Sequence, residues 1–446
     1  MVSLQRESFT EQEFHTIGIS LFEPQLVRTM FLSDDYKLLK KLAAHKKIVI
    51  FTNYEIGEFL EVKIEEVGIN GVEILKLDNI NAGFLAKVFS FCLRWSDSSL
   101  ATLRNLQIEK NFKRINMFGY LLRRIFFILF SHSRSLKQLF RYLFLFTYDI
   151  KNVINSSRIP IPQVDVFFAS ALTNAESDLP LSIFFKKRLT PVIATLRSWD
   201  NLVTKGTLGF QPNILLSHSD YMTDLATRVH GISASSIVQS VTPSYQKHFL
   251  PRIHTNSNSD LKIAYGCIGP VLNPDEINFI NWLGEISTEV KASITVVQHP
   301  KFEHNLHQIN TGNLIFKTFD YLNSTLQDYY SFIAEQNFII ASGTTFALDS
   351  MFVNTPLIGL GFEIVEQDYW FSHLRSFDTF PHSKYLFSKL GITKLSNKLE
   401  LIAILKGKSI SYDFMSNASA LQVLTGDIEI CFDDQIFNLL NNKFFD

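Results

Sequence analysis

Several signals that mark common protein classes are missing from this chain of 446 residues. Its three cysteines, Cys92, Cys267 and Cys431, lie far apart without a CxxC pair, so they fit neither a disulfide framework nor a structural zinc site and indicate a reducing compartment. No window reaches the roughly 18 uncharged apolar residues of a membrane span. The polar stretch Met1 to Phe14 is not a signal peptide. We therefore expect a cytoplasmic protein, or one bound to the inner face of the cytoplasmic membrane.

The chain also lacks an excess of charge and the familiar cofactor motifs. Its formal net charge is −1 and no nucleic-acid module is recognisable, so we expect no nucleic-acid partner. There is no Walker-type Gly-x-x-x-x-Gly-Lys-Ser/Thr, no Gly-x-Gly-x-x-Gly and no His-Glu-x-x-His motif. An Asp-x-Asp motif, which would hold a diphosphate through a cation, is missing too. A diphosphate site in this protein is therefore expected to use neither a metal ion nor another cofactor.

What is present is an alternation of predicted strands and helices. Hydrophobic residues make up 46% of the chain and charged residues 19%, an ordinary globular balance, and the length predicts about two or three domains. Short β-branched runs predict strands at 16–22, 48–52, 72–77, 164–169, 192–196 and 214–217. After a linker-like segment, 251–260, strands are predicted at 261–265, 294–297, 314–316, 338–341 and 357–360. The fold class is α/β, with two Rossmann-like domains facing a cleft.

This pattern also predicts the domain boundaries. The first domain is 1–250, with a helical insertion at about 82–153, and the second is 261–385. Residues 386–446 form a helical tail, whose helix near Lys398 to Leu405 is expected to pack on the first domain. The helix that begins near Pro24 is predicted to continue to Leu42.

Two strand-to-helix junctions carry the strongest functional signal. Ile294 to Pro300 and Phe338 to Thr345 each begin as a β-branched run and end in small or polar residues. Ligands bind at the carboxyl ends of strands in open α/β sheets. Ser342, Gly343, Thr344 and Thr345 would place hydroxyl and N–H groups at a helix start, which suits a phosphate, although a plain helix cap is the alternative.

Two further residues extend this predicted nucleotide-phosphate site. His299 would supply a second donor to the phosphate, or would be a loop histidine held by a backbone carbonyl. Gly266, with Gly269 nearby, ends the first strand of the second domain. These glycines would let the backbone approach a ligand, or would only form a tight turn.

A polar loop, Arg197 to Gly206, follows a strand of the first domain. Asp200 is the carboxylate that we select for chemistry, as a base or as a nucleophile. Trp199 would pack against a sugar or desolvate this acid. The alternative for Asp200 is an Asp-Asn turn that shapes the cleft. Lys205 and Arg197 would neutralise phosphate or remain solvated.

Longer stretches of the sequence resemble known groups of proteins. The two α/β halves and a His-Pro after a strand resemble the GT-B class of glycosyltransferases. Most of the chain, except the aromatic insertion and the C-terminal tail, also resembles a group of bacterial surface-carbohydrate biosynthesis proteins. The matching stretches are Ser-Trp-Asp-Asn-Leu-Val-Thr-Lys-Gly at 198–206, His230-Gly231-Ile232, Val27-Arg28-Thr29, and Ala341 to Thr345 with Asp349.

The resemblance implies a metal-independent glycosyltransferase that moves a sugar from a nucleotide donor to a capsule, O-antigen or lipid-linked glycan. It assigns catalysis to Asp200 and His299, with the nucleotide bound on the second domain by Gly266, His299 and 342–345. It places the acceptor beside Arg28, Ser198, Trp199, Asn201 and Lys205, although from the sequence alone Arg28 is an exposed helix residue. Related patterns occur in nucleotide-sugar 2-epimerases, so an epimerase, a hydrolase or a non-catalytic glycan-assembly protein remains an alternative. The longer acidic motif of such families is reduced here to Glu363 and Glu366.

The segment 111–151 departs from the neutral charge of the chain. It combines abundant aromatic residues with eight cations and one acid, Asp149: Lys113, Arg114, Arg123, Arg124, Arg134, Lys137, Arg141 and Lys151. By their spacing, Arg134, Lys137 and Arg141 share one helical face. Such a face suits an anionic membrane surface, which would present a lipid-linked acceptor. The alternative is a set of core helices with a solvated basic edge.

Overall fold

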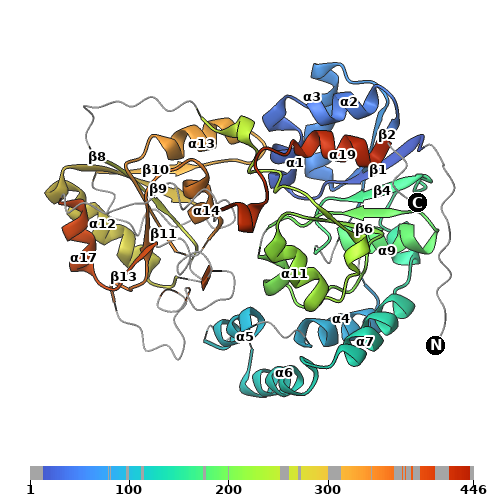
Figure 1. Cartoon of the computed structure of the whole chain (residues 1–446), viewed down its shortest axis with the longest axis horizontal. Helices are drawn as coiled ribbons and strands as arrows, with labels where there is room; N and C mark the ends of the chain where they lie inside the picture. The colour runs from blue at the N-terminus through green and yellow to red at the C-terminus, as the bar shows by residue number, and fades with distance from the viewer. Residues whose placement is uncertain are drawn as a thin grey trace.

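The computed structural model describes residues 14–78, 80, 82–96, 100–111, 115–173, 177–198, 200–251, 261–269, 273–299, 313–342, 344–365, 374, 377, 383–384, 392–406 and 421–441. These residues form two parallel β-sheets, each with helices packed on it (Figure 1). None of the described helices has the length and apolar character that a membrane span requires.

The first sheet has seven parallel strands in the order β3-β2-β1-β4-β5-β6-β7. Their side chains are mostly buried, as expected for a parallel sheet covered on both faces. Six of the strands lie where the sequence predicts them, and β7 is an additional short edge strand. The bounds are β1 Thr16–Ser20, β2 Lys47–Thr52, β3 Val72–Lys76, β4 Val166–Ala169, β5 Val192–Ala194, β6 Ile214–Ser217 and β7 Ile237–Gln239.

The second sheet has six parallel strands in the order β10-β9-β8-β11-β12-β13. Five of them match predicted strands, and β13 was not predicted. Because the strand order reverses beside β8, the carboxyl ends of β8, β9 and β11 meet at a topological switch point. The bounds are β8 Leu261–Gly266, β9 Ala292–Gln298, β10 Leu314–Thr318, β11 Phe338–Ala341, β12 Leu357–Leu360 and β13 Thr393–Leu395.

The helices around the sheets include one correction to the prediction. The helix expected from Pro24 to Leu42 is divided into α1 (Pro24–Met30) and α2 (Lys37–Ala43), because Asp35 and Tyr36 adopt left-handed backbone conformations with φ of 49° and 57°. The other helices outside the insertion are α3 Tyr54–Val67, α8 Lys151–Ile154, α9 Asp178–Lys187, α10 Asn201–Thr204, α11 Asp220–Arg228, α12 Glu276–Val290, α13 Leu326–Ala334, α14 Thr345–Phe352, α17 Lys398–Leu405 and α19 Phe432–Asn441.

The helices near the end of the chain divide between the two domains. α17 packs on α12 of the second domain, since Leu401 and Leu405 are buried in the core of the second sheet. The expectation that α17 packs on the first domain is therefore wrong. It is α19 that lies on α2 of the first domain, where Phe432 and Ile436 are fully buried.

The insertion in the first domain consists of four helices, α4 (Phe84–Trp95), α5 (Leu100–Asn111), α6 (Met117–Phe130) and α7 (Arg134–Thr147). The predicted basic face of α7 is only partly exposed: Arg134, at the start of the helix, is exposed, whereas Lys137 and Arg141 are only 7% and 8% accessible. Arg141 donates from Nε to the carbonyl of Leu208 at 3.0 Å and from Nη2 to that of His230 at 2.8 Å. These bonds fix the cationic side of α7 against the first domain.

Candidate functional site

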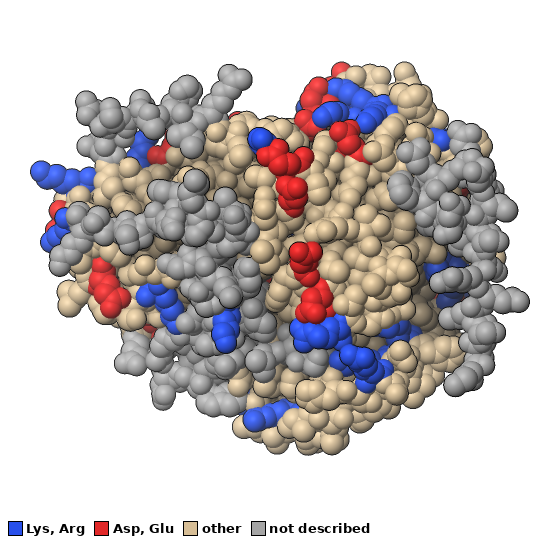
Figure 2. All heavy atoms as spheres, in the orientation of Figure 1, with Lys and Arg blue, Asp and Glu red and all other residues tan. Residues whose placement is uncertain are grey.

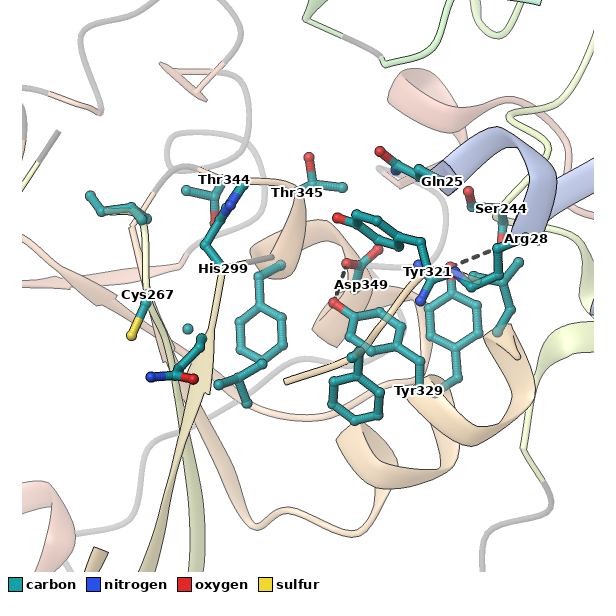
Figure 3. Close-up of a pocket in the computed structure, with 18 of the residues that line it drawn as sticks. Gln25, Arg28, Ser244, Cys267, His299, Tyr321, Tyr329, Thr344, Thr345 and Asp349 are labelled. Atoms are coloured by element: carbon teal, nitrogen blue, oxygen red, sulfur yellow. Dashed lines mark hydrogen bonds between the residues drawn. The ribbon is translucent and has the colours of Figure 1, made fainter. Parts of the chain in front are cut away.

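A cavity of about 360 Å³ lies between the two domains. The first domain contributes α1 and the start of the polar loop, and the second contributes the carboxyl ends of β8, β9 and β11. In the view of Figure 3, His299 and Thr344 lie together on one side, Arg28 lies on the other, and Asp349 lies between them. The polar lining residues that the argument uses are Arg28, Arg197, His299, Thr344, Thr345 and Asp349.

Arg28 is a buried cation on the wall that the first domain contributes. Helix α1 turns this residue inward, so that it is only 4% exposed, whereas the sequence alone suggested an exposed position. Its guanidinium carbon lies 4.7 Å from the ring centroid of Tyr321 and 5.2 Å from that of Tyr329. Its Nε and Nη1 atoms have no hydrogen-bond partner among the described residues. Since a buried charge with unpaired donors is costly, this guanidinium is suited to an anion that enters the cavity.

Asp349 is the buried acid of the cavity, and it lies in α14. Its Oδ2 accepts a hydrogen bond from the hydroxyl of Tyr329 at 2.7 Å, and its Oδ1 accepts one from Tyr245 at 2.8 Å. Burial raises the pKa of Asp349 to about 6, while the two tyrosine hydrogen bonds and the Arg28 charge act in the opposite direction. The carboxyl group therefore titrates close to neutral pH.

The start of α14 does not use its hydroxyl groups as a plain cap. Thr344 occupies the N-cap position, but its side chain makes no capping hydrogen bond. The hydroxyl oxygens of Thr344 and Ser342 are both buried and have no partner among the described residues. Thr344 and Thr345 line the cavity, whereas Ser342 is buried and does not line it, and Gly343 lies outside the described residues. The Thr344 hydroxyl is therefore available to a ligand at a helix N-terminus.

His299 and Gly266 reach the cavity from neighbouring strands. His299 directly follows β9 and is half-buried in the lining. Gly266 ends β8, and a Cβ at this position would lie 2.2 Å from Cδ1 of Phe346, which also lines the cavity. The packing of this ring thus requires glycine at 266. Gly269 has a φ of +87° and donates its N–H to Oε2 of Glu276 at 3.0 Å, as expected for a turn.

Among the described residues of the predicted polar loop, only Arg197 lines the cavity, and it forms an ion pair with Glu23. Asp200 does not line the described cavity, and its Oδ2 accepts a hydrogen bond from Oγ1 of Thr204 at 3.0 Å. Asn201 is buried and donates to Oγ1 of Thr173 at 3.1 Å. These contacts favour the alternative in which the loop is structural.

The three other loop residues assigned to the acceptor side are not in the described lining either. Ser198 is half-buried, Lys205 is exposed, and Trp199 lies outside the described residues. A role for them in acceptor binding stays a prediction.

The sequence interpretation missed the tyrosines of the site. Tyr321 contacts Arg28, Tyr245 contacts Asp349, and Tyr329 contacts both, but the spacing of these tyrosines in the sequence shows no pattern. From the sequence, Asp349 is only one of the residues that carry the resemblance, and no role is assigned to it. Among the described residues, no group of three or more histidine, cysteine, aspartate and glutamate side chains is arranged to hold a metal ion.

Comparisons with known proteins show a fold and no closer relationship. No protein-family model matches this chain, and no curated protein matches it. The chain is similar to the UDP-GlcNAc 2-epimerase of Neisseria meningitidis bound to UDP-GlcNAc, with 10% identity, a TM-score of 0.50, and coverage of 96% of this chain and 100% of that chain.

Two further solved structures have lower scores. The UDP-GlcNAc 2-epimerase of Methanocaldococcus jannaschii in complex with UDP-GlcNAc and UDP has 14% identity, a TM-score of 0.48 and coverage of 95% and 99%. The glycotransferase of kitacinnamycin has 9% identity, a TM-score of 0.49 and coverage of 96% and 98%. At these identities the Neisseria structure supports the fold alone, and with the two parallel sheets it confirms the predicted GT-B-like class. The resemblance to surface-carbohydrate proteins stays a prediction.

Proposed function

We propose that this protein is a glycosyltransferase that moves a sugar from a nucleotide donor to a surface-glycan acceptor at the cytoplasmic face of the membrane. One observation carries the proposal. Arg28 and Thr344 belong to different domains and line the same cavity, and both have buried hydrogen-bond donors that lack a partner among the described residues. A diphosphate between the domains would satisfy both groups.

The donor would bind mainly on the second domain. Its phosphates would lie at the N-terminus of α14, close to Thr344 and Thr345, where the positive end of the helix dipole favours an anion. His299 would donate to the departing nucleotide and stabilise the negative charge that develops on it. Arg28 would reach the same phosphates from the first domain, so that closure of the two domains would exclude water from the sugar.

Transfer to an acceptor hydroxyl requires a base, and we propose Asp349 for this role in place of Asp200. Asp349 is the only carboxyl group among the described residues of the cavity lining. Its pKa of about 6 allows it to be ionised at neutral pH and still to accept a proton. The acceptor would be a glycan or a lipid-linked sugar, as the resemblance implies.

The second candidate is a nucleotide-sugar 2-epimerase or hydrolase, because the fold is shared with the Neisseria 2-epimerase. An epimerase or hydrolase would need further carboxyl groups around the sugar ring, and the described lining offers only the carboxyl of Asp349. Transfer makes a smaller demand on carboxyl groups, which is why we favour it. A non-catalytic glycan-assembly protein would show binding without turnover.

A panel of nucleotide sugars tests the proposal. UDP-sugars come first, since UDP-GlcNAc is named for the Neisseria structure. Released nucleotide together with an enlarged acceptor supports a transferase. An isomerised donor indicates an epimerase, nucleotide release without an acceptor product indicates a hydrolase, and tight binding without turnover indicates an assembly protein. Loss of binding in Arg28→Ala, with Lys37→Ala as an exposed cationic control, ties the result to this cavity.

A further inference from the structure

The helical insertion carries an apolar face that is open to solvent. We define the apolar face as the exposed non-polar side chains of α4, α6 and α7. Its most exposed members are Phe84 (80%), Phe118 (75%), Phe146 (73%), Tyr142 (64%), and Ile128 and Leu129 (62% each). Soluble proteins rarely expose so many large apolar side chains on neighbouring helices, and such patches mark interaction sites.

The three helices form one continuous surface. α4 packs against both α6 and α7. Beneath the face, Phe140 of α7 lies 6.0 Å from Phe126 and from Phe130 of α6, measured between ring centroids. Figure 1 shows this layer at the end of the first domain that points away from the first sheet. The apolar side chains therefore lie on one side of the molecule and are not scattered over it.

Helix α7 exposes aromatic side chains and buries two cationic ones, which is the reverse of the arrangement that favours solubility. Tyr142 and Phe146 point to solvent, whereas Lys137 and Arg141 are buried. The hydrogen bonds of Arg141 to Leu208 and His230 lock this orientation. Because these bonds hold Arg141 inward, the outward position of Tyr142 and Phe146 is a built feature of the fold.

The charge of the insertion indicates which kind of partner binds the apolar face. Residues 82–160 contain thirteen lysine and arginine residues and three aspartate and glutamate residues, so the rest of the chain, whose overall charge is −1, is net negative. Lys87 of α4, Arg124 of α6 and Arg134 of α7 are exposed cations on the three helices that carry the face. In Figure 2, lysine and arginine are the charged residues visible along the lower edge, below α11. A second copy would bring these cations against each other, whereas an anionic lipid surface would attract them.

We propose that α4, α6 and α7 bind the surface of a membrane that contains anionic phospholipid, with their apolar side chains between the headgroups. α6 lies in the interface plane, and the flanking cations contact lipid phosphates. The insertion contacts the loop that reaches the site, because Asn105 of α5 donates a hydrogen bond to the Thr204 carbonyl at 3.5 Å and Arg197 of the same loop lines the cavity. The delivery of a lipid-linked acceptor rests on the proposed function, but membrane binding itself does not.

Sedimentation of the full chain with phospholipid vesicles tests this proposal. Vesicles of phosphatidylcholine alone are compared with vesicles that also contain phosphatidylglycerol, at low and high salt and without nucleotide. We expect binding to the anionic vesicles that weakens with salt. The variant with Phe118→Ser and Ile128→Ser should bind at least about tenfold more weakly, and Arg124→Ala and Arg134→Ala about fivefold more weakly for each cation removed.

Matched controls come from exposed apolar residues of other helices. Val62→Ser in α3 and Leu399→Ser in α17 remove side chains that are 54% and 77% exposed but lie outside the apolar face, so vesicle binding should not change. The proposal is overturned if the chain does not bind anionic vesicles, or if both sets of variants bind equally. It is also overturned if the face variants convert a dimer into a monomer in analytical ultracentrifugation while vesicle binding is absent. Failure of sugar transfer would leave the vesicle result unaffected.

Discussion

Arg28 and Asp349 come from different domains and are joined through one side chain, Tyr329. The guanidinium carbon of Arg28 lies 5.2 Å from the centroid of the Tyr329 ring, and the hydroxyl of this tyrosine donates to Asp349 at 2.7 Å. A cation–π contact and a charge-assisted hydrogen bond thus connect the two halves of the cavity. A ligand that binds Arg28 would also fix how the domains face each other.

Removal of the Arg28 side chain should reduce the affinity for UDP by about 100-fold, since a charge-assisted hydrogen bond contributes about 1.5–3 kcal/mol. Arg28→Lys should give an intermediate loss, because lysine keeps the charge without the planar donor geometry. Isothermal titration calorimetry measures both effects. Equal affinities in Arg28→Ala and the native chain would show that the phosphate lies elsewhere.

Thr344→Val separates a ligand role from a capping role. Because the Thr344 side chain makes no capping hydrogen bond, the free energy of unfolding should stay within about 0.5 kcal/mol of the native value. The affinity for UDP should fall about tenfold when the hydroxyl is lost.

The matched control for this prediction is Thr325→Val. Thr325 forms a complete capping box with Asp328 at the start of α13, so this variant should lose about 1 kcal/mol of stability and keep its affinity. Denaturant unfolding and calorimetry give the two quantities. A stability loss in Thr344→Val like that in Thr325→Val would favour the capping alternative.

The buried Asp349 makes the stability depend on pH in a defined direction. In the folded chain the pKa of Asp349 is about 6, whereas the ordinary value of an aspartate is 3.8. The folded state therefore binds the proton more tightly than the unfolded state does. The contribution of this group to the free energy of unfolding is therefore greatest below pH 3.8 and is lost as the pH rises to about 6, by about 3 kcal/mol. Asp349→Asn should remove this part of the slope. Denaturant titrations at several pH values give the free energy of unfolding of the native chain and of Asp349→Asn. If this free energy changes with pH in the same way in both proteins, the assignment is contradicted.

Gly266→Ala should disturb the cavity through Phe346, whose ring atom Cδ1 would lie 2.2 Å from the new Cβ. Overpacking of this kind costs about 1–3 kcal/mol. In the double variant with Phe346→Ala, the clash is gone, so the combined loss should be smaller than the sum of the single losses. Additive losses would mean that the two residues do not compete for the same space.

Asp200→Ala tests the carboxylate that the sequence favoured. The Asp200 side chain accepts a hydrogen bond from Thr204 and does not line the described cavity. We therefore expect the turnover of the variant to stay within a factor of about three of the native value, with a stability loss of about 1 kcal/mol. A drop in turnover of about 100-fold or more, with normal stability, would identify Asp200 as the base and argue against Asp349.

The sequence by itself determined the alternation of strands and helices and the place of the two junctions that carry His299 and Thr344. β-branched runs that stop at small or polar residues are local patterns, and parallel strands bring their carboxyl ends to one edge of a sheet. For the same reason the fold class was predictable. The break between α1 and α2 was not, because the left-handed conformations of Asp35 and Tyr36 have no glycine to mark them.

Only the tertiary structure decided which side chains face each other across the domains. Arg28 points inward because the rings of Tyr321 and Tyr329, some three hundred positions later in the chain, cover its guanidinium. Arg141 is buried because two carbonyl groups from distant loops accept its hydrogen bonds, and this turns the aromatic side of α7 outward. Helical periodicity shows which residues share a face, but not which face is buried. That choice depends on partners that are distant in sequence and are brought close only by folding.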